Sequence, residues 1–117
     1  MAGYRSGLEE RLAKYLDKEN VPYLYEVEKF SYVTESKYTP DFFLPNGIII
    51  EAKGFFKPSD RRKMLAVQKA HPHLDIRFVF QRDNTLSKNS KTTYTMWAEK
   101  HGFPACIFPD IPPSWLT

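Results

Sequence analysis

One stretch, YTPDFFLPNGIIIEAKG at residues 38–54, constrains the fold of this chain more than any other. Two apolar runs, Phe42–Leu44 and Ile48–Ile50, lie on either side of Pro45-Asn46-Gly47, which is a strong turn signal. Short apolar runs that flank a glycine-containing turn are typical of a hairpin. We therefore predict two antiparallel strands joined by a tight turn.

The charged residues of this stretch lie at the ends of the two predicted strands. Asp41 follows Pro40 directly before the first run, and Glu51-Ala52-Lys53 follows the second. Because side chains alternate along a strand, Glu51 and Lys53 share one face, about 6.6 Å apart along the axis, and Asp41 lies within reach across the hairpin. Two carboxylates and one ammonium at one sheet edge indicate a divalent-metal site with a charged helper.

This combination suits phosphodiester hydrolysis. Mg²⁺ takes hard oxygen ligands, usually one or two carboxylates, and keeps several waters. The ion activates water and stabilises charge on the phosphate, and a lysine orients the nucleophile or offsets the same charge. The alternative is an ordinary Pro-Asp turn beside a chance Glu-x-Lys on an exposed strand. The surrounding strand–turn–strand pattern favours the metal site.

Length and composition favour one folded α/β domain over residues 1–117. Hydrophobic residues make up 42% of the chain, which argues against disorder. The single cysteine, Cys106, excludes an internal disulfide and suits a reducing compartment. Apolar runs are too short to span a membrane, and the first residues lack the apolar core of a signal peptide. We expect a soluble intracellular protein without a membrane partner.

Charge is distributed unevenly along the chain. Residues 1–52 carry 6 basic and 9 acidic side chains, whereas residues 53–100 carry 11 basic and 4 acidic ones. An acidic segment followed by a basic segment fits a metal site beside a phosphate-binding face. The simpler alternative is a solvated basic surface. The candidate DNA contacts are Arg5, Lys57, Arg61, Arg62, Lys63, Arg82, Lys88 and Lys91.

Periodicity and turn signals place the remaining elements. We expect a helix from Ser6 to Asn20, a strand from Tyr23 to about Val33, a helix at 61–70, a strand at 75–80, a surface loop at 81–91, a helix from Thr92 or Thr93 to Gly102, a strand at 103–108 and an extended tail at 109–117. Ser59 or Asp60 is the expected cap of the second helix. Four residues are expected in the core or docking a helix: Phe55, Phe56, Met96 and Trp97.

Glu9 has two interpretations. Ser6 and Glu9 match the capping box, in which the glutamate binds the backbone amide of the cap residue. The alternative is a third carboxylate near the metal site. Three converging carboxylates repel one another, so we expect at least one raised pKa when no metal is bound.

The order of elements and the Pro-Asp and Glu-x-Lys motifs resemble the restriction-endonuclease-like superfamily, whose core is a mixed β-sheet flanked by helices. The chain also resembles the bacteriophage endonuclease I family of junction-resolving enzymes. The matching stretches are YRSGLEE (4–10), YTPDFFLPNG (38–47), EAKG (51–54), DRRK (60–63), HPHLDIRFVF (71–80) and EKHG (99–102).

The resemblance implies roles for particular residues. Asp41 and Glu51 look like the metal ligands, together with the Ala52 carbonyl, and Lys53 looks like the catalytic lysine. Glu9 matches a further essential carboxylate, which favours the site over the cap alone, and it is the candidate ligand of a second metal. The family cuts branched DNA with Mg²⁺ or Mn²⁺ and leaves 5′-phosphate ends. Its members form intertwined dimers, which here would exchange residues 1–37 around a catalytic core at 38–108.

We therefore expect a metal-dependent DNA endonuclease of the four-way-junction-resolving type, which would act in the host cytoplasm if it is phage-encoded. One alternative is a homing-type nicking endonuclease that recognises a sequence in duplex DNA as a monomer. A second is a DNA-binding module without catalytic activity. The sequence does not decide whether the protein is a dimer or a monomer, or whether the site binds one metal ion or two.

Overall fold

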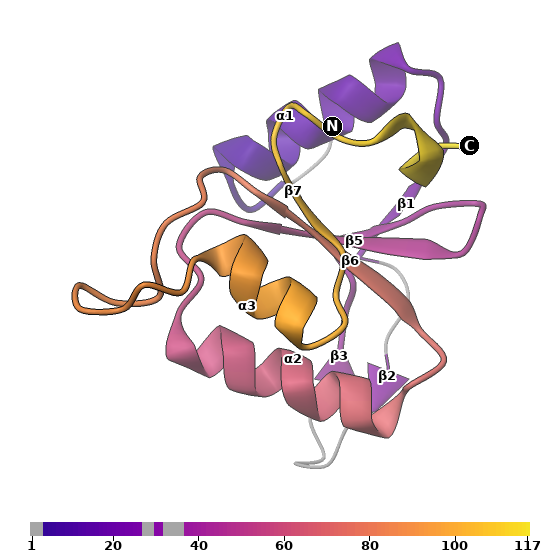
Figure 1. Cartoon of the computed structure of the whole chain (residues 1–117). Coiled ribbons are helices and arrows are strands. Elements are labelled where there is room, and N and C mark those ends of the chain that lie inside the picture. Colours follow the sequence, from indigo (N-terminus) through magenta and orange to yellow (C-terminus); the bar gives the residue numbers. More distant parts are fainter. Residues whose placement is uncertain (1–3, 27–29, 32–36) are drawn as a thin grey trace.

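The centre of the molecule is a five-stranded mixed β-sheet with the strand order β1-β4-β5-β6-β7 (Figure 1). The computed structural model describes residues 4–26, 30–31 and 37–117. β1, β4 and β5 pair antiparallel, and β5, β6 and β7 pair parallel. This mixed sheet flanked by helices confirms the expected α/β class and is compatible with a restriction-endonuclease-like core. The elements are α1 (Gly7–Lys18), β1 (Leu24–Tyr25), β2 (Phe30–Ser31), β3 (Lys37–Tyr38), β4 (Phe42–Phe43), β5 (Ile48–Lys53), α2 (Pro58–Ala70), β6 (Asp75–Phe80), α3 (Tyr94–Lys100), β7 (Ala105–Ile107) and the 3₁₀ turn η1 (Pro113–Trp115).

Both faces of the sheet are covered. In Figure 1, α1 and the C-terminal segment lie over one face, and α2 and α3 lie over the other. Ile48 and Ile50 of β5 pack in the cluster that contains α1 and Trp115. Ile49 packs in the second cluster, with Phe56 and the helices α2 and α3. Parallel strands buried on both faces read as continuous apolar runs, which explains the three consecutive isoleucines of β5.

The predicted hairpin is confirmed. Phe42 pairs with Ile50 across β4 and β5, and the Gly47 amide donates to the Leu44 carbonyl at 3.0 Å to close the turn. Gly47 has a φ of +90°, a backbone conformation that residues with a Cβ rarely adopt. Asn46 accepts from the Ile48 amide at 3.0 Å and donates from Nδ2 to the Trp115 carbonyl at 2.9 Å. The turn is therefore fixed both locally and against the C-terminal segment.

The boundaries of α1 follow the expected signals. Ser6 Oγ accepts from the Glu9 amide at 3.1 Å, which identifies Ser6 as the N-cap. Asn20 has a left-handed φ of 57°, its amide donates to Asp17, and the Val21 amide donates to Leu16. These two bonds form a Schellman motif, which satisfies the last carbonyls of the helix.

The expected start of α2 was wrong. The helix begins at Pro58, its N-cap is Lys57, and Asp60 is the third helical residue. The Asp60 carboxylate accepts from the Lys57 amide at 3.1 Å, so Asp60 binds back to the cap residue instead of being it. Pro58 occupies the first helical position, where its missing N–H costs no hydrogen bond. Ser59 is an exposed residue inside the first turn.

The single strand expected from Tyr23 to Val33 was also wrong. β1 ends at Tyr25, because Glu26 turns the backbone into the left-handed region with a φ of 53°. Phe30 and Ser31 then pair with β3 in a separate two-stranded sheet. Residues 27–29 and 32–36, which include the expected end at Val33, lie outside the described residues.

Two of the four residues expected to be buried are exposed. Phe56 and Trp97 lie in the second cluster, and their rings are 5.1 Å apart. Phe55 is 71% exposed because its neighbour Phe56 points inward, and Met96 is 53% exposed on the outer side of α3. Other expected elements are confirmed: β6 spans the predicted residues, Thr93 caps α3, and β7 lies within 103–108. The tail expected to be extended at 109–117 was wrong in part, because Pro113–Trp115 form the 3₁₀ turn η1, in which the Trp115 amide donates to the Pro112 carbonyl.

None of the helices in the described residues combines the length and the apolar character that crossing a bilayer requires.

Candidate active site

The β4–β5 hairpin brings Asp41 and Glu51 together in the interior. Both side chains are nearly inaccessible to solvent. Asp41 Oδ2 accepts from the Ala52 amide at 2.9 Å, and Glu51 Oε2 accepts from the Asp41 amide at 3.1 Å. Each carboxylate is thus held by the backbone of the other strand. The Tyr38 hydroxyl also donates to Glu51 Oε2 at 2.7 Å.

The Ala52 carbonyl lies on the β4 side of β5. In a strand, the N–H and C=O of one residue point to the same neighbouring strand. The Ala52 amide donates to Asp41 on the β4 side, whereas the next carbonyl, that of Lys53, accepts from the Gln81 amide on the β6 side at 3.0 Å. This parity puts the Ala52 carbonyl on the same side of β5 as Asp41, and its role as a metal ligand stays a prediction.

Glu9 joins this site from α1. Its side chain is buried, and it accepts from the Arg5 amide at 3.0 Å and from the Tyr25 hydroxyl. The capping-box interpretation expected Glu9 to bind the amide of Ser6. Glu9 instead binds the amide one residue earlier, because the chain turns at the helix start and Tyr25 holds the carboxylate on the side of Asp41. Glu9 therefore supports the helix start and faces the site.

Arg5 lies among the carboxylates. Its Nη2 is 2.5 Å from Asp41 Oδ1 and 3.3 Å from Glu9 Oε2, and its Nε is 2.6 Å from Glu26 Oε2. Burial, the largest single influence, lowers the pKa of the guanidinium. Asp41, followed by Tyr25, Glu9 and Glu26, together outweigh it and raise that pKa. One carboxylate oxygen each from Glu9, Glu26 and Asp41 lies within 4.8 Å of the others.

The pKa values of the two hairpin carboxylates are raised, as expected for converging acids. Burial, and then the charge of Glu51, raises the pKa of Asp41 to about 8. Burial also raises the pKa of Glu51, although the charge of Lys53 opposes the shift. The pKa of Tyr38 is raised first by burial and then by Glu51, so its hydroxyl stays a donor. The site strongly favours a bound cation or a bound proton.

The comparisons with known proteins show the family of this chain. A family model described as phage endonuclease I matches residues 1–117. The chain belongs to this family. It is 43% identical to endonuclease I of Escherichia phage T7 over 122 residues, which cover 99% of this chain and 80% of the relative. It is 46% identical to endodeoxyribonuclease 1 of Enterobacteria phage T3 over 103 residues, which cover 85% of this chain and 68% of the relative.

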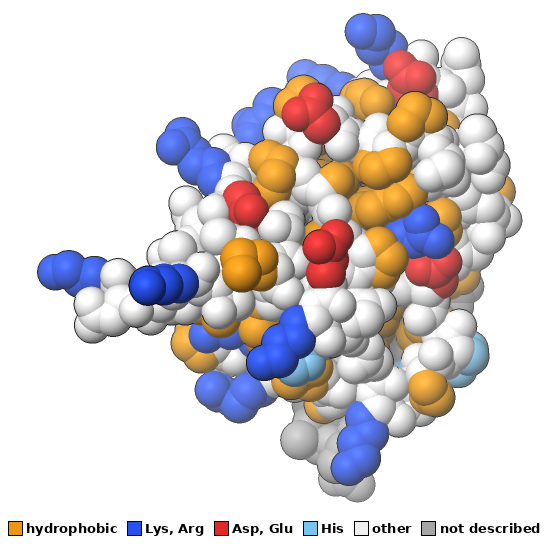
Figure 2. Space-filling view, in the orientation of Figure 1, with side chains coloured by type: hydrophobic (Ala, Val, Ile, Leu, Met, Phe, Trp, Pro, Cys, Tyr) orange, Lys and Arg blue, Asp and Glu red, His pale blue; other side chains and the backbone are white. Residues whose placement is uncertain are grey.

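In this member of the phage endonuclease I family, most of the candidate DNA contacts lie on two surfaces outside the carboxylate cluster. Lys57, Arg62 and Lys63 are exposed at the start of α2. Arg82, Lys88 and Lys91 are exposed in the loop 81–91, which projects from the molecule in Figure 1 and carries basic side chains near its tip in Figure 2.

Two other candidates differ from these. Arg61 is partly buried and donates to the Phe56 carbonyl at 2.9 Å, so its guanidinium supports the loop that follows β5. Arg5, expected as a DNA contact, is engaged with the three carboxylates.

Sequence reasoning missed Glu26, Tyr25 and Tyr38. The alternating pattern predicted only that Tyr25 and Glu26 belong to one continuing strand. Their roles depend on the turn at Glu26 and on the approach of α1, which no local motif indicates. Tyr38 begins the stretch that carries Asp41, but nothing in the sequence shows that its hydroxyl reaches Glu51.

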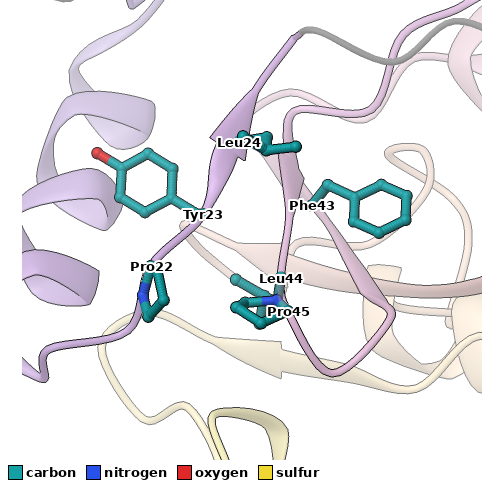
Figure 3. A pocket seen from close by; sticks show the side chains of 6 residues that line it. All are labelled: Pro22, Tyr23, Leu24, Phe43, Leu44 and Pro45. Carbon is teal, nitrogen blue, oxygen red and sulfur yellow. The ribbon is translucent and has the colours of Figure 1, made fainter.

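An apolar hollow lies between β1 and β4, away from this chemistry (Figure 3). Its described lining consists of Pro22, Tyr23, Leu24, Phe43, Leu44 and Pro45, and these side chains include no carboxylate, amine or imidazole. The hollow therefore lacks the groups that bind a metal or move a proton at neutral pH, and the carboxylate cluster stays the candidate active site.

Proposed function

We propose that this chain is a DNA endonuclease that hydrolyses phosphodiester bonds with a divalent ion, Mg²⁺ or Mn²⁺. Its membership of the phage endonuclease I family and its relatives named endonuclease I and endodeoxyribonuclease 1 support the nuclease activity. The observation that carries the metal dependence is the buried pair Asp41 and Glu51, each held by the backbone of the opposite strand, with Lys53 at the end of β5.

The residues of the site fit a divalent cation. Asp41, Glu51 and the Ala52 carbonyl supply hard oxygen ligands of the kind that Mg²⁺ prefers. In the structure, one guanidinium lies within ion-pair distance of both Asp41 and Glu9, which supports a cation among these acids. Glu9 is the candidate ligand of a second ion. When bound, the metal acidifies water and stabilises charge on the phosphate.

The chain's own residues orient the reaction. Tyr38 and the Asp41 amide fix one oxygen of Glu51, and the Ala52 amide fixes one oxygen of Asp41, so the second oxygen of each carboxylate has a set direction. Lys53 is only half-buried, so its ammonium can meet the phosphate, offset developing charge and orient the attacking water. Cleavage of the P–O3′ bond would leave a 5′-phosphate.

We propose branched DNA, in particular four-way junctions, as the substrate. The exposed basic residues of α2 and of the loop 81–91 offer two separate phosphate-binding surfaces, which suits DNA with more than one arm. A dimer that exchanges residues 1–37 would place two sites in fixed relation. The host cytoplasm, where phage DNA is replicated, is the proposed location.

A single-strand nicking activity on duplex DNA is the second candidate. The observation that favours it is that Glu9 of α1 and Asp41 of the same chain lie together, with one carboxylate oxygen of each within 4.8 Å of the other and Arg5 paired to both. A monomer with a complete site would cut one strand at a time.

Cleavage of a labelled four-way junction and of a linear duplex with the same arm sequence tests the proposal. Both substrates are incubated with Mg²⁺ or with EDTA, and strand-specific labels report each cut. Paired symmetric cuts in the junction alone would support a dimeric resolvase, and single nicks in both substrates would support the second candidate. Metal-independent cleavage would refute the proposed chemistry, and binding without cleavage would refute the activity.

Lys53→Ala separates catalysis from binding. We expect this variant to lose cleavage at least about a hundredfold, because it lacks the cation at the reacting phosphate, while junction binding in Ca²⁺ survives. Lys69→Ala, an exposed lysine at the far end of α2, is the matched control and should retain both. If Lys53→Ala abolished binding together with cleavage, Lys53 would not have the assigned role.

A further inference from the structure

The guanidinium of Arg5 is surrounded by carboxylates from three segments of the chain. Glu9 comes from the first turn of α1, Glu26 directly follows β1, and Asp41 directly precedes β4. The nitrogen–oxygen distances are 3.3 Å to Glu9, 2.6 Å to Glu26 and 2.5 Å to Asp41. These contacts use Nη2 for two of the acids and Nε for the third, so one side chain joins all three.

The spacing of these oxygens is the spacing of ligands around a single ion. One oxygen of each carboxylate lies within 4.8 Å of the others. Oxygens on opposite sides of a bound Mg²⁺ are about 4.2 Å apart, and those around the larger Ca²⁺ are about 5 Å apart. A divalent ion at Asp41 and Glu9 would therefore occupy the space that the guanidinium fills, and the two cations cannot be there together.

The four side chains differ in their freedom to move. The side chains of Asp41 and Glu9 are 1% and 5% exposed, so their positions are fixed by packing. Arg5 is 61% exposed and can leave without opening the core. Glu26 is 26% exposed and is held beside the site by the left-handed turn that ends β1. A non-glycine residue in this conformation persists only where its surroundings hold it, and the ion pair with Arg5 Nε is such a constraint.

We propose that Arg5 is an internal cation that, in the metal-free protein, occupies the position of a divalent ion between Asp41 and Glu9. It is exchanged for that ion when the metal binds, and Glu26 is the positioning residue that keeps the displaced guanidinium beside the site. This inference rests on the proposed metal dependence. It gives Arg5 two positions: between Asp41 and Glu9 before metal binding, and on Glu26 at the entrance of the site afterwards, where it faces the DNA phosphate. Metal affinity is lowered by this competition, and cleavage is favoured by the tether.

Metal binding without DNA tests the exchange. Mg²⁺ is titrated by calorimetry into the wild-type chain, Arg5→Gln, Arg5→Lys and the control Arg11→Gln. Arg11 is an exposed arginine of α1, so its substitution changes the net charge equally. We expect Arg5→Gln to bind Mg²⁺ at least about tenfold more tightly than wild type, because charge-assisted hydrogen bonds of the guanidinium no longer compete. Arg11→Gln should stay within about threefold of wild type, a change of less than about 0.7 kcal/mol.

Arg5→Lys is the control for a loss of folding in Arg5→Gln. It keeps one positive charge, but a single ammonium cannot bridge both Asp41 and Glu26, so its Mg²⁺ affinity should lie between those of wild type and Arg5→Gln. Equal or weaker Mg²⁺ binding by both Arg5 variants would overturn the exchange. If the wild-type chain itself bound no Mg²⁺, the proposed metal dependence would fail and this inference with it. Binding by wild type without tighter binding by the variants would refute this inference alone.

Glu26→Gln tests the tether. We expect its Mg²⁺ affinity to stay within about threefold of wild type, while single-turnover cleavage at saturating Mg²⁺ falls about tenfold, because the guanidinium is no longer held at the entrance. A loss of Mg²⁺ affinity of about tenfold or more would make Glu26 a metal ligand and overturn its assigned role. Unchanged cleavage would also overturn it.

Discussion

Replacing Asp41 with asparagine should change how the stability of the metal-free protein depends on pH. Asp41 is 1% exposed, and its pKa is raised to about 8 by burial first and by the charge of Glu51 second. An asparagine at this position would keep the size of the side chain and its acceptor for the Ala52 amide. The substitution removes the charge that burial disfavours, together with its ion pair to Arg5.

The sign and the magnitude follow from proton linkage. An unfolded aspartic acid titrates near 3.9, well below the value of about 8 in the folded protein. Between these values the folded state binds about one proton more than the unfolded state. This contribution to stability is fully present below the unfolded pKa and is lost as the pH rises through the folded pKa. The free energy of unfolding of wild type should therefore fall, relative to Asp41→Asn, by about 1.4 kcal/mol per pH unit, or roughly 3 kcal/mol between about pH 5 and pH 7.

Urea unfolding in EDTA at several pH values measures this difference. Asp110→Asn is the matched control, since it makes the same chemical change at an exposed residue. For a chain of this size, roughly 3 kcal/mol corresponds to about 10 °C in the midpoint of thermal unfolding, which is well within detection. At pH 7 to 8, Mg²⁺ should raise that midpoint for wild type and have little effect on Asp41→Asn, because a bound metal replaces the proton.

Parallel stability profiles for wild type and Asp41→Asn would refute this reasoning. They would show that Asp41 is charged at all these pH values, with Arg5 compensating its burial completely. Parallel profiles together with a strong Mg²⁺ effect would still identify Asp41 as a ligand, but not as the proton-binding group of the empty site.

Three further expectations concern single side chains. Phe56→Ala should lower the free energy of unfolding by about 3 to 5 kcal/mol, because this ring is fully buried among four aromatic rings. Phe55→Ala, at an exposed ring, should change it by less than about 0.5 kcal/mol, and urea unfolding compares the two variants. Tyr38→Phe should cost about 1 to 3 kcal/mol, because Glu51 loses a buried donor, and unchanged stability would show that this hydrogen bond contributes nothing. Asn20→Gly should raise the free energy of unfolding by up to about 1 kcal/mol, and the thermal midpoint with it, since glycine adopts the left-handed conformation without a Cβ; a decrease would indicate that the asparagine side chain matters.

The parts of the fold that local chemistry determines could be predicted from the sequence. The hairpin, the end of α1 at Asn20 and the Thr93 cap each depend on residues within one turn or one strand pair. Phe55 and Phe56 show the limit. Two adjacent aromatic residues look alike in the sequence, yet only tertiary packing decides which one becomes the centre of a cluster.

The candidate site shows the same division. Asp41, Glu51 and Lys53 could be identified because one hairpin carries all three. The connection of Arg5 to Glu26 could not, since it requires a left-handed glutamate after β1 and the start of α1 to meet. An alternating pattern predicts a continuing strand there, and no local signal marks the turn.

The position of β5 between two packed layers has a consequence for how activity is lost. Glu51 is bound by Tyr38, which belongs to the layer of α2 and α3, whereas Glu9 belongs to the layer of α1. Local opening of either layer separates these acids while the other layer remains folded. Such openings need less free energy than global unfolding. The nuclease should therefore become inactive on warming before it melts, at a temperature set by whichever layer opens first, and amide exchange in α1 and α2 would identify that layer.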